Sequence, residues 1–169
     1  MLFIPIAGTE FFTLNDSSHG FFSGGSQRLD MVAAGRSAGV VGRAYSASAL
    51  TAGKVIGPGN GFFNGFGRMA AGICQGPEST SFIEGAFANT THRFLGFKFK
   101  LQSKVHYGWA RFFRVTVLGC QGGPAVSTTL TGYAYESVAN KSIVAGKTKG
   151  ADVTTMQPGS LGHLALGKK

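Results

Sequence analysis

The stretch "FLGFKFKLQSKVHYGWARFFRVTV", residues 94–117, decides the fold class of this chain. In its "FKFKL" segment (97–101), apolar residues alternate with lysines, which is the period of a half-buried strand. A polar segment follows, and then a run rich in aromatic and β-branched residues that favours a second strand. The stretch therefore predicts an antiparallel hairpin.

The length of the hairpin loop sets which side chains share a face, because a one-residue shift exchanges the two faces. A two-residue loop would pair Leu101 with Lys104 and place the lysines of 97–101 beside Tyr107 and Trp109. A three-residue loop, Gln102–Lys104, would instead gather the apolar residues of both strands on one face. We therefore select the three-residue loop.

This choice assigns every side chain of the hairpin to a face. The predicted buried face holds Phe97, Phe99, Leu101, Val105, Tyr107 and Trp109. The predicted solvent face holds Lys98, Lys100 and His106. Arg111 breaks the alternation, and two explanations stay open: a β-bulge that resets the phase, or an arginine at the sheet rim with its head in water.

The composition extends this strand pattern to the whole chain. The 169 residues fit one domain, and 27 glycines, about twice the average usage, indicate many tight turns. Predicted strands lie near residues 10–14, 27–33, 39–45, 54–56 and 82–87. "LNDSSHG" (14–20) predicts a turn and "GPGNGFFNGFG" (57–67) a loop anchored by its phenylalanines. No window predicts a helix.

We therefore predict an all-β fold, an antiparallel β-sandwich of short strands punctuated by glycine. One domain is expected over residues 1–150, followed by a C-terminal tail over 151–169.

The net charge of +9 favours anionic partners such as acidic polysaccharide, nucleic acid or another polyanion. The candidate binding residues for such a partner are Arg93, Lys98, Lys100, Lys104, Arg111 and Arg114. The alternative interpretation is a solvated basic face above a buried aromatic face.

Sequence patterns for catalysis are absent. The seven acidic residues are scattered, the four histidines lack metal-ligand spacing, and no nucleophile elbow occurs. We expect no enzymatic activity, no cofactor and no metal. Cys74 and Cys120 form one disulfide if the chain is exported, and remain free thiols in the cytoplasm.

Three segments carry a family resemblance: "RFLGFKFKLQSKVHYGWARFFRVTV" (93–117), "TTLTGYAYESVANKSIVAGK" (128–147) and "MQPGSLGHLALG" (156–167). They resemble the C-terminal part of bacterial PEP-CTERM-type exported proteins, acidobacterial ones in particular. The resemblance implies an exported β-sandwich domain from bacteria whose sorting systems accompany exopolysaccharide production. It covers 93–146, and more weakly 50–63.

The segments expected to hold the signal peptide and the sorting signal differ from this family pattern. The tail keeps Pro158 and the "LG" pairs but lacks the hydrophobic span and terminal arginines of a sorting signal. The first residues lack the basic segment and the long apolar run of a signal peptide, and no apolar run is long enough to span a membrane. We expect a decayed or incomplete copy, so export and retention in the cytoplasm both stay open.

Three functions remain. The leading expectation is a non-catalytic structural or adhesive protein of the cell surface that associates with acidic exopolysaccharide. A nucleic-acid or general polyanion binder that uses the basic hairpin face comes second. A hydrolase of cell-surface polymers comes third.

Overall fold

The computed structural model describes residues 2–5, 11–21, 24–34, 37–75, 80–118, 125–149 and 153–156. All secondary-structure elements in these ranges are β-strands, so the all-β class is confirmed. Nowhere in these ranges is there a helix with the length and apolar character that crossing a bilayer requires.

The strands run in the following order along the chain: β1 (Leu2–Pro5), β2 (Phe11–Phe21), β3 (Gly24–Ala34), β4 (Gly39–Arg43), β5 (Ser46–Ala47), β6 (Val55–Ile56), β7 (Phe62–Phe63), β8 (Gly65–Gln75), β9 (Thr80–Glu84), β10 (Thr90–Leu101), β11 (Lys104–Leu118), β12 (Ala125–Glu136), β13 (Ile143–Val144) and β14 (Val153–Met156). Twelve of them join one sheet in the order β1-β2-β3-β8-β5-β4-β10-β11-β12-β14, with β7 on β4 and β9 on β8. All pairs are antiparallel except the single β5–β8 bridge, which is parallel.

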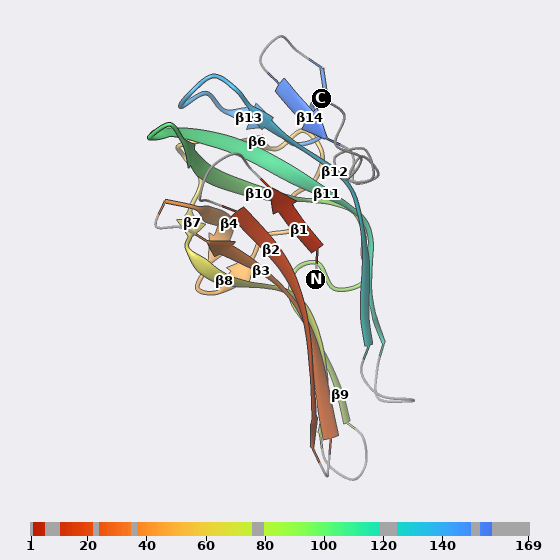
Figure 1. Cartoon of the computed structure of the whole chain (residues 1–169). Coiled ribbons are helices and arrows are strands. Elements are labelled where there is room, and N and C mark those ends of the chain that lie inside the picture. Colours follow the sequence, from red (N-terminus) through yellow and green to blue (C-terminus); the bar gives the residue numbers. More distant parts are fainter. Residues whose placement is uncertain are drawn as a thin grey trace, which may run out of the picture.

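The sheet bends at β4 and β5, so that its two halves face each other (Figure 1). The N-terminal half carries β3 and β8, and the C-terminal half carries β10, β11 and β12. Apolar side chains from both halves form the main core, for example Met31 and Met69 from one and Phe97, Phe99 and Phe112 from the other. The two layers are halves of one continuous sheet, so the two separate sheets of a sandwich are not confirmed.

A second core lies on the opposite face of β10 and β11. The short ribbon of β6 and β13 covers this face, and Ile56 and Ile143 from the ribbon pack with Phe94, Tyr107 and Trp109. The hairpin is therefore buried on both faces, with the N-terminal half on one side and the ribbon on the other.

The hairpin uses the two-residue loop, so the predicted register is wrong. Leu101 pairs with Lys104, and Gln102 and Ser103 have φ of 49° and 64°, as in a type I′ turn. Phe99 consequently stands opposite His106, and Lys98 opposite Tyr107. Solvent does not cover either face of the hairpin as a whole: both faces are packed against other strands and both hold aromatic side chains, so alternation alone does not set the register.

In the observed register, the side chains of the hairpin lie on other faces than predicted. Trp109 is buried as predicted, with 1% of its surface exposed, but it lies beside Phe94 and not beside Phe97 and Phe99. The Phe94 and Trp109 rings meet edge to face with their centroids 5.3 Å apart. His106, predicted to face water, is buried and stacks on Phe99.

The irregularity predicted at Arg111 is a β-bulge. The pairing of β11 with β12 shifts register between Arg111 and Phe112 and again between Phe112 and Val115. Both Phe112 and Val115 therefore point into the main core, which simple alternation would not permit.

Other local predictions are corrected. The turn predicted over 14–20 is wrong, because β2 continues through it and pairs with β3 along its whole length. The loop predicted over 57–67 contains β7 and the start of β8, and its Phe62 and Phe63 pack on the two cores. β14 pairs with β12, so the first residues of the predicted tail take part in the sheet.

Candidate functional site

The six basic residues predicted as a binding site do not share one surface. By register, Lys98, Lys100 and Arg111 lie on the ribbon side of the hairpin, whereas Arg93 and Lys104 lie on the other side. Arg114 follows the bulge and is exposed. The basic hairpin face expected from the sequence is therefore divided between two faces.

Two members of this set are occupied by contacts within the protein. The Lys98 ammonium lies 5.1 Å from the ring centroid of Phe62, a cation–π contact. The Arg111 guanidinium donates from Nε to the Thr131 hydroxyl at 2.8 Å. Both side chains are half-buried, so they are poorly placed to bind a large polyanion.

Six exposed lysines lie instead at the hairpin tip and in the segments next to the ribbon. The Asn140 N–H donates to the Val105 carbonyl at 2.8 Å, which places Lys141 near Lys104. The Ala145 N–H donates to the Lys54 carbonyl at 2.8 Å, which extends the ribbon by one residue pair and places Lys54 beside Ala145. We call this set the lysine surface: Lys54, Lys100, Lys104, Lys141, Lys147 and Lys149.

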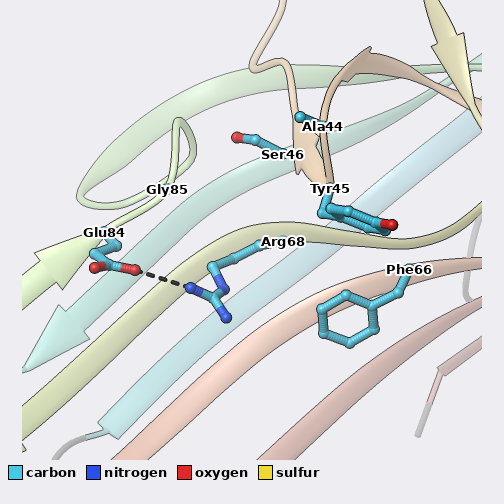
Figure 2. Close-up of a pocket in the computed structure, with 7 residues that line it drawn as sticks. All are labelled: Ala44, Tyr45, Ser46, Phe66, Arg68, Glu84 and Gly85. Atoms are coloured by element: carbon cyan, nitrogen blue, oxygen red, sulfur yellow. Dashed lines mark hydrogen bonds and ion pairs between the residues drawn. The ribbon is translucent and has the colours of Figure 1, made fainter.

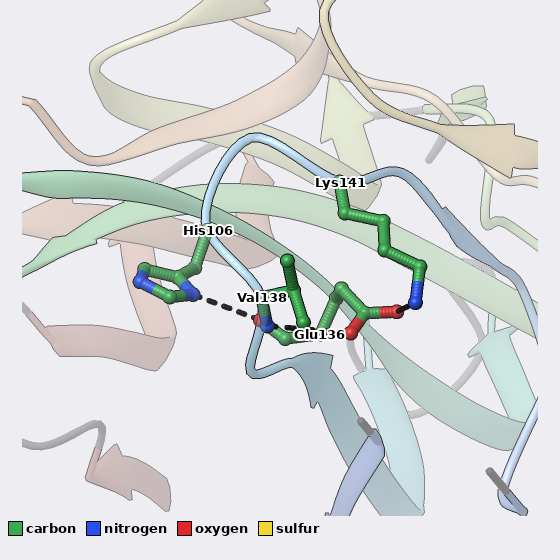
Figure 3. Close-up of polar contacts among 4 residues, drawn as sticks. All are labelled: His106, Glu136, Val138 and Lys141. Carbon is green, nitrogen blue, oxygen red and sulfur yellow. Dashed lines mark hydrogen bonds and ion pairs between the residues drawn. The ribbon is translucent and has the colours of Figure 1, made fainter. Parts of the chain in front are cut away.

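A buried network holds the segment that carries Lys141 (Figure 3). His106 Nδ1 lies 2.9 Å from the Glu136 carbonyl oxygen and donates to it, since a carbonyl can only accept. The Glu136 carboxylate accepts from the Val138 N–H at 3.3 Å and lies 3.6 Å from the Lys141 ammonium. His106 and Glu136 are both buried, so the exit from β12 has a defined path.

Among the described residues, one carboxylate, that of Glu136, pairs with a member of the lysine surface, Lys141. Three acidic side chains belong to the described part of the chain, and each has a basic neighbour. Glu84 contacts Arg68 at 2.9 Å, Glu136 contacts Lys141, and Asp30 is buried near Arg68 and Arg28. Within that part of the chain, exposed basic residues outnumber exposed acidic ones, so the net exposed charge is positive.

Asp30 is the most perturbed of these acids. Burial raises the pKa of its carboxyl from 3.8 to about 6, and the positive charges of Arg68 and Arg28 offset only part of this effect. Among the described residues, neither carboxylate oxygen has a hydrogen-bond partner, and only 1% of Asp30 is exposed. A group this buried does not reach a substrate, so we do not assign Asp30 a catalytic role.

A pocket of about 280 Å³ that the sequence patterns did not reveal lies beside β8 (Figure 2). It is lined by Ala44, Tyr45, Ser46, Phe66, Arg68, Glu84 and Gly85. Arg68 pairs with Asp30 across the β3–β8 ladder, and its guanidinium reaches Glu84. A second cavity of about 340 Å³ adjoins this one and shares Ser46.

The remaining sequence candidates have separate positions. Cys74 is disulfide-bonded, whereas Cys120 lies outside the described residues, so their pairing stays a prediction. His92 is exposed and contacts Phe113; His163 and the side chain of His19 lie outside the described part. Among the described residues, no three His, Cys, Asp or Glu side chains gather in a way that could hold a metal ion.

Comparison of the chain with protein-family models, with curated proteins and with solved structures finds no match.

Proposed function

We propose that this protein is an exported, non-catalytic β protein that holds acidic exopolysaccharide on its lysine surface. The observation that carries the proposal is the sign of the exposed charge. In the described part of the chain, Asp30 and Glu136 are buried and Glu84 pairs with Arg68, whereas the six residues of the lysine surface are exposed; one of them, Lys141, pairs with Glu136. A linear polyanion gains affinity at such a surface through the release of its counterions.

Four aromatic side chains of the hairpin are buried, which argues against base stacking beside the hairpin lysines. Proteins that bind single-stranded nucleic acid display aromatic rings on which bases stack. In this hairpin, Phe97, Phe99, Tyr107 and Trp109 are all buried and cannot serve in this way. The resemblance to exported proteins adds the cell surface as the place of action.

The proposal is tested by binding to immobilised polygalacturonate, with neutral dextran as the control matrix and elution by a salt gradient. We expect retention on polygalacturonate alone. The double variant Lys104→Gln/Lys147→Gln should elute at lower salt because it removes two charges from the lysine surface.

The double variant Lys98→Gln/Arg111→Gln is the matched control. It removes the same charge from side chains that are half-buried and engaged, so its elution should change less. Equal shifts for both pairs would contradict a localised lysine surface. Tighter binding to single-stranded nucleic acid, with discrimination between base sequences, would make the protein a nucleic-acid binder.

A further inference from the structure

We propose that the pocket lined by Tyr45, Phe66, Arg68 and Glu84, here the Tyr45 pocket, binds one neutral sugar unit of a glycan chain. The ring of the sugar would stack on Tyr45, and two of its hydroxyls would pair with Arg68 and Glu84. This site lies apart from the lysine surface and works without net charge attraction, so it does not depend on the function proposed above.

Tyr45 is displayed by a turn with an unusual backbone. Arg43 pairs with Ser46, and the two residues between them, Ala44 and Tyr45, have φ of 40° and 68°. Turns of this type favour glycine, asparagine and aspartate, so two other side chains in the left-handed region store strain. The sequence thus places an aromatic ring, 71% exposed, at a position where a smaller residue would be easier to accommodate.

Neighbouring backbone holds this turn in place. The Arg68 N–H donates to the Tyr45 carbonyl at 2.7 Å, and Ser46 forms the parallel bridge to Arg68. Because Phe66 lies two residues before Arg68 on β8, both side chains project from the same face. Phe66 is 40% exposed and provides a second apolar wall (Figure 2).

The polar part of the pocket is the ion pair between Arg68 and Glu84. The two side chains meet at 2.9 Å, and 49% of the Glu84 side chain is open to solvent. The Arg68 side chain is 29% exposed, and its guanidinium carries five donors, more than the contact with Glu84 uses. A sugar hydroxyl both donates and accepts, so neighbouring hydroxyls can donate to Glu84 and accept from Arg68.

The local charge favours a neutral sugar over an acidic one. Arg68 already faces Glu84 and lies beside the buried Asp30, with Arg28 close to the same carboxyl. An acidic sugar would bring a third carboxylate to this group and meet Glu84. The volume of the pocket is near the lower end of ligand sites, about 300 Å³, which suits one ring. The adjoining cavity offers space for the next unit of the chain.

The experiment is calorimetric titration of the whole protein with cellotetraose, maltotetraose and mannotetraose, each at low and at high salt. We expect at least one of these neutral tetrasaccharides to bind with an affinity that salt leaves unchanged. Tyr45→Ala and Glu84→Gln should each weaken binding about tenfold or more, whereas Tyr45→Phe keeps the stacking ring and should bind as the original.

Failure of all three tetrasaccharides to bind would overturn the proposal, as would unchanged affinity in both Tyr45→Ala and Glu84→Gln. The Lys104→Gln/Lys147→Gln variant should bind the tetrasaccharide normally. If the original protein is not retained on polygalacturonate but binds a tetrasaccharide, the lysine surface alone is refuted. If it is retained but binds no tetrasaccharide, the Tyr45 pocket alone is refuted.

Discussion

Replacing Asp30 with asparagine tests the energetic role of its buried carboxyl. Its pKa rises from 3.8 to about 6 because burial penalises the charged form more than Arg68 and Arg28 stabilise it. At about 1.4 kcal/mol per pH unit, this difference corresponds to a cost of about 3 kcal/mol at neutral pH. Asparagine has nearly the same shape and no charge, so it should remove that cost.

The sign of the pH dependence follows from proton binding. Between pH 4 and pH 6 the folded protein binds a proton at Asp30 that the unfolded chain releases, so the free energy of unfolding falls as pH rises through this window. We expect Asp30→Asn to match the original protein near pH 4. Above pH 7 it should be more stable by up to about 3 kcal/mol.

Urea denaturation across pH 4 to 8 measures this difference. Glu84→Gln serves as the control, since it removes the same charge from a partly exposed ion pair whose loss should cost about 0–1 kcal/mol. If Asp30→Asn is less stable than the original protein at pH 7, the attraction of the two arginines outweighs burial and the reasoning is refuted.

Further substitutions test the packing and the disulfide. Trp109→Ala should lower the free energy of unfolding by about 3–5 kcal/mol, and emission from this single tryptophan should be blue-shifted in the native state. Gly108→Ala should cost about 1–3 kcal/mol in urea denaturation, because the new Cβ would lie 2.7 Å from a backbone carbonyl oxygen. Gly59→Ala meets no atom within 4 Å and should be near neutral. Replacing Cys74 and Cys120 with serine should cost about 4 kcal/mol if they are joined, and thiol titration should find no free thiol before reduction.

Local sequence signals predicted part of this fold. The alternation of residues 97–101 predicted the hairpin, and the apolar setting of Trp109 predicted its burial. The break in alternation at Arg111 left two explanations open, and one of them was the β-bulge. The register depended on what covers each face of the hairpin. One face is covered by a ribbon of two strands, Val55–Ile56 and Ile143–Val144. Each strand has two residues, which is too short to show a periodic sequence pattern.

The candidate sites were harder to predict because they combine distant segments. The Tyr45 pocket joins a turn, the start of β8 and the end of β9, and no motif connects them. The positive charge was visible in the composition, but its distribution was not. Which lysines are exposed depends on the register of β10 and β11 and on the backbone bond from Asn140 to Val105.

The two-residue turn at Gln102 and Ser103 also bears on the order in which the protein folds. Closing so short a loop costs little chain entropy, so β10 and β11 can pair before segments that are distant in sequence meet. The N-terminal half joins this hairpin through β4 and must cross a long stretch of chain to cover the main core. We expect the hairpin tip, with Lys100 and Lys104, to form early. The Tyr45 pocket lies next to the junction of the two halves of the sheet. It would then be complete only when the N-terminal half has packed against the hairpin.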